Sequence, residues 1–180
     1  MPSDAPQTPV LSPDLAAAIE RGYAQRDRAN MQPTVDHFEA LLTQDPEHPV
    51  LLYEVGGAYD TAGQEERAAA FYQRAMDRGL GGDVRRRCLI QYGSTLRNLE
   101  RFDESVALLE EARTQFPASD AVRTFLALSL HAAGRSDAAV AELLTLVADR
   151  LDGADISRYH AALRGNAAYL AELDGGTGAP

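Results

Sequence analysis

Residues 92–105 read YGSTLRNLERFDES, and this stretch sets a pattern that recurs along the chain. A small residue, Gly93, is followed one turn later by Leu96, and a second small residue, Ser105, comes after a break near Glu100. The same order occurs 37 residues earlier, 34 residues later and, more weakly, 34 residues before the earlier copy. A period of this length is typical of stacked helix–turn–helix units, none of which can bury its apolar face alone. We therefore predict four repeats, over 15–48, 49–82, 86–119 and 120–153.

Each recurring residue type has a physical role in such a unit. Small residues such as Gly56 on the first helix and Ala68 on the second let neighbouring helices approach closely, and large apolar residues at helical spacing fill the space between them. Gly63 and Gly134 stand where a first helix must end, in a C-cap that favours positive φ. The pattern thus predicts an all-α fold.

The ends of the array have their own signals. Ser12, followed by a proline and an acid, predicts the start of the first helix. One apolar stripe over 154–173 predicts a terminal helix that covers the last repeat. Asp83 begins its helix about three residues early, which lengthens that helix by about one turn. Residues 1–14 and 174–180 are predicted to be mobile tails.

The quoted stretch, residues 92–99 together with 101–105, resembles the tetratricopeptide repeat family, and in particular the small bacterial proteins of tetratrico peptide repeat group 5. The resemblance covers about residues 15–153 and is best over 84–147. It implies a right-handed α–α superhelix of about four repeats with a capping helix. The first aromatic position of the family pattern is absent from this chain, where it is occupied by Ala18, Leu52, Leu89 and Arg123.

Composition limits the classes of partner and compartment. The formal net charge is −10, which argues against binding to nucleic acid or to an anionic membrane, and the run 85–87 of arginines lacks the interleaved aromatics of a nucleic-acid site. A single cysteine, Cys88, leaves no disulfide framework, and residues 1–12 lack the basic and apolar segments of a secretory signal. We expect a cytoplasmic protein without a membrane span.

The sequence offers little catalytic chemistry. It contains no lysine, so it has neither a P-loop nor a Schiff-base residue, and its four histidines lack metal-ligand spacing. We expect no enzyme activity, no cofactor and no metal. Cys88 follows three arginines that could activate its thiol, but a small buried residue at a helix contact is the simpler interpretation.

The family resemblance also implies which side chains face the concave groove. These are Tyr23, Arg26, Tyr53, Asp60, Arg87, Gln91, Ser94, Arg97, Asn98, Thr124 and His131. Such a mixture of aromatic, cationic and amide groups suits a peptide, with an acidic group near Arg87, Arg97 and His131. The competing interpretation is a solvated polar face that binds nothing.

One familiar ligand class does not fit. Family members that clamp the acidic tail of chaperones use a set of cationic and amide residues, for which this chain has Ile19, Tyr23, Glu54, Arg87 and Gln91, and only Arg87 matches. The leading hypothesis is therefore a non-catalytic adaptor or assembly scaffold that holds another protein or peptide. The alternatives are a small-molecule sensor or hydrolase using Cys88 or His131, or a self-associating structural unit, and the oligomeric state is left open.

Overall fold

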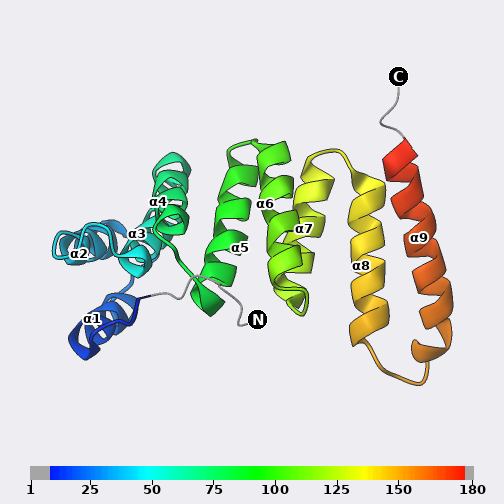
Figure 1. Cartoon of the computed structure of the whole chain (residues 1–180), viewed down its shortest axis with the longest axis horizontal. Helices are drawn as coiled ribbons and strands as arrows, with labels where there is room; N and C mark the ends of the chain where they lie inside the picture. The colour runs from blue at the N-terminus through cyan, green and yellow to red at the C-terminus, as the bar shows by residue number, and fades with distance from the viewer. Residues whose placement is uncertain (1–8, 177–180) are drawn as a thin grey trace, which may run out of the picture. The chain divides into compact units, whose positions relative to one another are not determined.

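The structure of the chain, a computed structural model, describes residues 9–176 and is all-α over that range (Figure 1). The predicted all-α class is confirmed. The parts of the predicted tails at 1–8 and 177–180 lie outside the described residues. The helices are α1 Pro13–Ala24, α2 Gln32–Leu42, α3 Pro49–Thr61, α4 Glu65–Asp77, α5 Gly82–Asn98, α6 Phe102–Gln115, α7 Asp120–Ala132, α8 Ser136–Arg150 and α9 His160–Gly176, with a 3-10 turn, η1, at Ser157–Tyr159.

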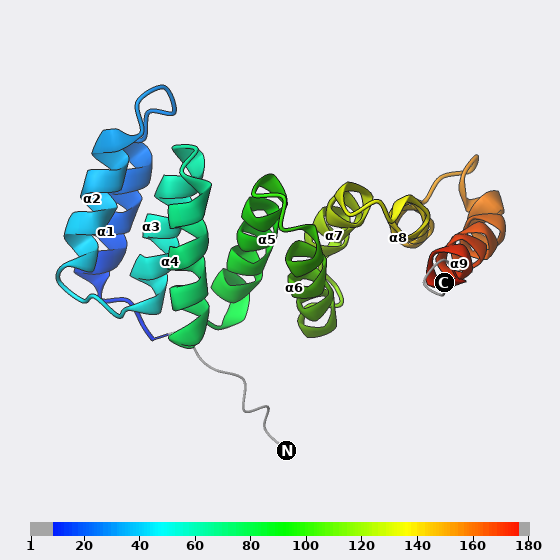
Figure 2. The same cartoon turned by 90° about the horizontal axis from the view of Figure 1, so that it is seen from above.

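The chain forms two compact units, Met1–Leu99 and Glu100–Pro180. In the first unit, α3 is the central helix and packs against α2, α4 and α5. Figure 2 shows α3 beside α4. Leu52, Val55 and Tyr59 of α3 are buried, as are Tyr72 of α4 and Leu89 of α5. Burial of these large apolar side chains supplies most of the driving force for folding of the unit.

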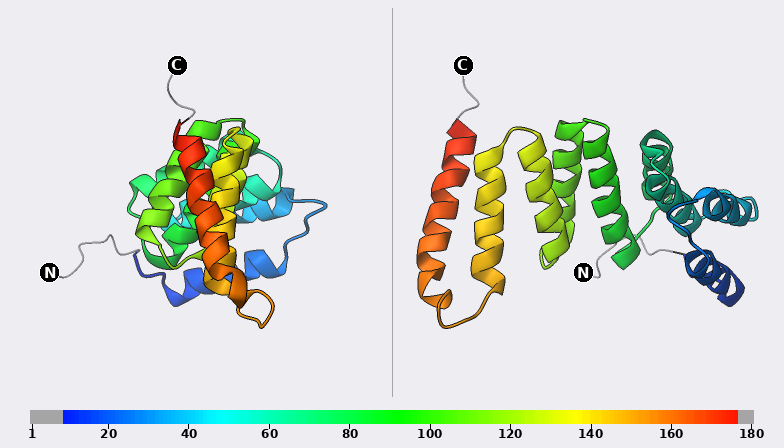
Figure 3. Two further views of the ribbon diagram at one scale, coloured as in Figure 1. Left: turned by 90° about the vertical axis from the view of Figure 1, so that its right-hand side faces the viewer. Right: turned by 180° about the vertical axis from the view of Figure 1, so that it is seen from behind.

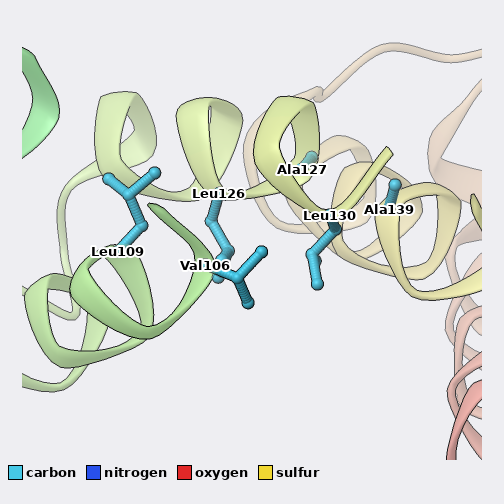
Figure 4. Packing of buried hydrophobic residues seen from close by; sticks show 6 residues of the cluster. All are labelled: Val106, Leu109, Leu126, Ala127, Leu130 and Ala139. Atoms are coloured by element: carbon cyan, nitrogen blue, oxygen red, sulfur yellow. The ribbon is translucent and has the colours of Figure 1, made fainter. Parts of the chain in front are cut away.

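The second unit is built around a cluster of apolar residues from α6, α7 and α8, which Figure 4 shows from close by. Its members are Val106, Leu109, Leu126, Ala127, Leu130 and Ala139. Beneath the α6–α7 contact, Ser105 and Ser129 are both buried and their hydroxyl oxygens lie 2.8 Å apart, within hydrogen-bond distance. The helices α8 and α9 run side by side at the end of the unit (Figure 3).

Close approach of helices occurs where the repeat pattern places glycine. A Cβ on Gly56 would lie 2.7 Å from Cδ1 of Tyr72, and a Cβ on Gly22 would lie 2.8 Å from Cζ of Phe38. No real Cβ tolerates such distances, so α3 and α4, and likewise α1 and α2, could not pack as they do with alanine at these positions. The predicted role of the small residues is confirmed at Gly22 and Gly56.

The ends of the helices follow the sequence signals. Oγ of Ser12 accepts a hydrogen bond from the Leu15 amide at 3.2 Å, which confirms the predicted N-cap. Gly63 and Gly134 have φ of 72° and 80°, as their predicted positions require. The third turn of this kind carries a glutamate instead, and Glu100 adopts φ of 59°. The early start of α5 is also confirmed, since it begins at Gly82 and has 17 residues where α3 has 13.

Arg123 occupies a position at which the family pattern has an aromatic residue, and it makes ion pairs there. Its guanidinium is largely buried, with the side chain 12% exposed, and it lies 2.7 Å from a carboxylate oxygen of Glu142 and 3.0 Å from one of Asp149. Both carboxylates belong to α8. A charge-paired arginine therefore joins α7 to α8 where a packed ring is usual.

The C-terminal helix differs from its predicted bounds. It begins at His160, later than the expected 154, and it continues to Gly176, so residues 174–176 are helical. The later start of α9 has a local cause. The amide of Gly153 donates to Oγ of Ser157 at 3.2 Å, which holds the segment between α8 and α9 as a turn. At the other end, α1 begins at Pro13, inside the predicted tail.

The glycine contacts predict the effect of adding one methyl group. We expect Gly56→Ala to lower the free energy of unfolding by about 1–3 kcal/mol, because the new Cβ overlaps the Tyr72 ring. Gly57→Ala is the matched control, since the nearest atoms to its Cβ are 3.8 Å away. Alanine is the better helix former, so we expect Gly57→Ala to raise the free energy of unfolding by about 0.5–1 kcal/mol. Urea unfolding measures both, and equal effects would contradict this account.

The left-handed conformation of Glu100 predicts a stabilising substitution. Glu100→Gly should raise the free energy of unfolding by about 0.5–1 kcal/mol, because glycine removes the left-handed penalty but adds chain entropy to the unfolded state. The reverse change at the equivalent turn, Gly134→Ala, should lower it by about 1 kcal/mol. Thermal unfolding of both variants checks the pair, and a loss of stability in Glu100→Gly would refute the strain argument.

Candidate functional site

A cavity of about 100 Å³ lies in the first unit between α1, α2, α3 and α5. Its apolar wall includes Met31 and Phe38. Its polar lining contains the predicted groove residues Tyr23, Arg26, Asp60 and Gln91, together with Glu54. The cavity thus brings together residues from helices that are far apart in sequence.

Glu54 is the most unusual group in this cavity, because it is a carboxylate that is only 8% exposed. It accepts a hydrogen bond from the hydroxyl of Tyr23. Burial raises the pKa of Glu54 to about 7, against smaller lowering effects from the Tyr23 hydrogen bond and the charge of Arg87. Burial and the neighbouring carboxylate likewise raise the pKa of Tyr23 above its ordinary value, which keeps its hydroxyl a donor.

A second carboxylate, Asp60, lies one to two turns along α3. It accepts a hydrogen bond from Oγ1 of Thr95 at 3.0 Å, and burial raises its pKa. Gln91 completes this side of the cavity, and its Oε1 accepts a hydrogen bond from the buried hydroxyl of Tyr72 at 3.0 Å. These bonds fix the side chains of α3, α4 and α5 relative to one another.

Arg26 is a cation of the cavity lining, but it does not neutralise Glu54. Its guanidinium carbon lies 5.6 Å from the centre of the Tyr23 ring, and its charge acts on the pKa of Tyr23. The cavity lining therefore contains two acids whose charges are only weakly compensated by the protein.

Other predicted groove residues of the first unit lie outside the cavity. Tyr53 is 4% exposed and packs at a tilt on Tyr72, with ring centres 6.1 Å apart, so its ring is part of the core. Arg87 is exposed and its Nε lies 3.0 Å from a carboxylate oxygen of Asp83, one turn earlier in α5. That acid, whose pKa is lowered chiefly by its hydrogen bond from Arg86, neutralises part of the predicted cationic site.

The end of α5 carries three further predicted residues. Nη2 of Arg97 donates to Oγ of Ser94 at 2.9 Å. The other terminal nitrogen, Nη1, is buried and has no hydrogen-bond partner within the described part of the chain. Burial accordingly lowers the pKa of Arg97. Asn98 is exposed at the last position of the helix.

Two predicted residues belong to the second unit. Thr124 is half-buried, and its hydroxyl donates to the carbonyl of Asp120 at 2.8 Å within α7. His131 is exposed in the last turn of the same helix. Neither lines the cavity of the first unit.

Cys88 lacks the properties of a nucleophile. Its side chain is fully buried in α5, and burial raises the pKa of its thiol to about 12, which outweighs the lowering effect of Arg85. The thiolate needed for nucleophilic attack is therefore scarce at neutral pH. Among residues 9–176, no group of three histidine, cysteine, aspartate or glutamate side chains is arranged to hold a metal ion.

Sequence reasoning missed the importance of Glu54, which entered only in the comparison with chaperone clamps. A usable signal was present, because Glu54 interrupts the apolar run LLY–V at residues 51–55 of a central helix. A helix that is apolar on every side is buried on every side, so an acid inside such a run is expected to be buried as well.

The raised pKa of Glu54 predicts a pH-dependent stability. Its folded pKa of about 7 exceeds the ordinary 4.5, so its contribution is fully present below about pH 4.5 and is lost as the pH rises through 7. We expect Glu54→Gln to leave stability nearly unchanged at low pH and to raise it by about 1–3 kcal/mol at about pH 8. Urea unfolding of both proteins across this range tests it, and a difference that stays constant with pH would exclude buried ionisation as the cause.

Comparison with known proteins fits this architecture. Within the described residues, no helix has both the length and the apolar character needed to cross a membrane. No curated protein matches the chain. The family model described as tetratrico peptide repeat matches residues 49–171, which include α3 to α8 and most of α9. The match and the all-α structure confirm the expected helical-repeat solenoid class, and the chain belongs to the tetratricopeptide repeat family.

Proposed function

We propose that this chain is a cytoplasmic, non-catalytic module that binds another protein or a peptide through the cavity of its first unit. Repeats of this family generally serve as scaffolds for protein interactions, and the single observation that carries the proposal is the cavity lined by Tyr23, Glu54, Asp60 and Gln91. A buried carboxylate, Glu54, and a half-buried one, Asp60, line the cavity and favour a ligand that supplies hydrogen-bond donors.

The chemistry of the cavity favours a basic group on the partner. A lysine or arginine head would offer several N–H donors and a positive charge to Glu54 and Asp60, both of which have raised pKa values through burial. A cation beside them would offset part of the desolvation cost. The volume of about 100 Å³ holds about three water molecules, which suits one side-chain head.

An acidic group on the same partner is a second feature of the proposal. The buried Nη1 of Arg97, which lacks a hydrogen-bond partner in residues 9–176, supports it. A carboxylate is the natural acceptor for that nitrogen. Arg87 contributes less, because Asp83 already lies against its guanidinium.

The competing functions find less support in the same observations. A hydrolase using Cys88 would require a thiolate, whereas the thiol is buried with a pKa of about 12. A small-molecule sensor would need a pocket of about 300–1,000 Å³. Two pockets of that size, about 520 Å³ beside α8 and α9 and about 450 Å³ beside α1, are lined by neither Cys88 nor His131.

A peptide display library tests the proposal. We expect wild type to select sequences enriched in lysine or arginine, and a selected peptide to bind the double variant Glu54→Gln/Asp60→Asn at least about tenfold more weakly, because both carboxylate charges of the cavity are removed. Binding to wild type should also weaken as the pH falls through about 7, since Glu54 then takes up a proton. Titration calorimetry measures each affinity.

The matched control is Glu66→Gln/Asp77→Asn, which removes two exposed acids of α4 and should leave the affinity unchanged. Equal losses in the two double variants would mean that only net charge matters. Selection of no peptide, or of peptides without basic residues, would count against the cavity as the binding site.

A further inference from the structure

The outer face of α9 is apolar and uncovered. Ala167 packs inward and is 5% exposed, while Tyr169 and Leu173 on the other side of the helix are 59% and 40% exposed. Tyr159, in the turn that precedes the helix, is 52% exposed. Three large apolar side chains this exposed on and beside one helix mark a candidate contact surface.

Gly165 stands in the middle of this face. Nothing lies within 4 Å of where its Cβ would be, and its φ is not in the left-handed region. A glycine inside a helix costs about 1 kcal/mol relative to alanine, and nothing in the fold of the chain requires one here. Its absent side chain does permit another backbone to approach closely.

Two charges lie at equal distances in sequence from Gly165, Arg158 in η1 and Glu172 in α9. Arg158 lies seven residues before Gly165 and Glu172 seven residues after it. The guanidinium of Arg158 lies 5.2 Å from the centre of the Tyr159 ring, and neither Arg158 nor Glu172 makes an ion pair within residues 9–176. The other charged groups facing α8 are engaged inside the unit, such as Arg164, which lies 3.1 Å from Asp149.

We infer that two copies of this chain associate through α9, with the two helices antiparallel and a two-fold axis at Gly165. The two glycine backbones meet at the axis, and Tyr169 of one copy covers the alanines at 161–162 of the other. Arg158 then lies opposite Glu172 of the partner subunit at both ends, as an isologous contact requires. A parallel pairing would place Arg158 against its own equivalent, so the charges select the antiparallel arrangement.

This inference is independent of the cavity and its ligand, because it concerns a different unit and a different class of contact. The occupant of the α9 face is a second copy rather than a basic peptide. The interface comprises one helix from each copy, so we expect weak association whose extent depends on protein concentration.

Sedimentation equilibrium of the full chain, from about 1 μM to about 1 mM, tests the inference. We expect the mass to rise from 19.4 kDa toward twice that value. Arg158→Glu and Glu172→Arg should each weaken association at least about tenfold by placing like charges together, and the two changes combined should restore it. Gly165→Leu should abolish it by blocking the close approach while leaving the circular dichroism spectrum of the folded chain unchanged.

Oxidative cross-linking gives a second readout, because it traps the associated form covalently. Gly165→Cys should form a disulfide between copies, whereas Ala171→Cys, which lines the groove beside α8, should not. The native Cys88 is buried and does not compete. A mass that stays at 19.4 kDa at every concentration would overturn the inference, as would a dimer in which the combined charge exchange fails to restore association.

Discussion

The packing of Tyr72 onto Gly56 is the contact on which the first unit depends. The ring occupies the space that a Cβ would fill, 2.7 Å from its expected position, and so sets how near α4 can come to α3. From there the hydroxyl of Tyr72 reaches Gln91, 3.0 Å away on α5. One missing methyl group therefore determines both the spacing of the repeat and the position of an amide in the cavity wall.

The same central helix carries the groups that make the cavity polar. Helix α3 is buried along most of its length, so its acids lie in an apolar environment with few compensating cations. A structural helix would ordinarily avoid this arrangement, because buried charge opposes folding. Glu54 and Asp60 thus occupy a part of α3 where acids do not favour folding. Residues of this kind are often found at functional sites.

Sequence reasoning recovered what depends on local pattern. The helical repeat, the small residues at close contacts and the long α5 follow from spacing and residue size, both of which can be read along one chain. It could not recover what depends on neighbours across the fold. The sequence alone suggests that the charge of Arg87 is available to a ligand, yet Asp83 one turn away lies against it. Tyr53 fits the family groove position, yet its ring is buried beside Tyr72. The start of α9 was displaced by a turn at Gly153 that periodicity does not register.

The burial of Cys88 has a practical consequence. The thiol is the sole cysteine of the chain and is fully enclosed in the first unit, so a thiol reagent can reach it only when that unit opens. The rate at which the native protein reacts with such a reagent thus reports opening of the first unit alone. Cys88 therefore serves as a native probe of opening in the first unit, without a cysteine having to be introduced.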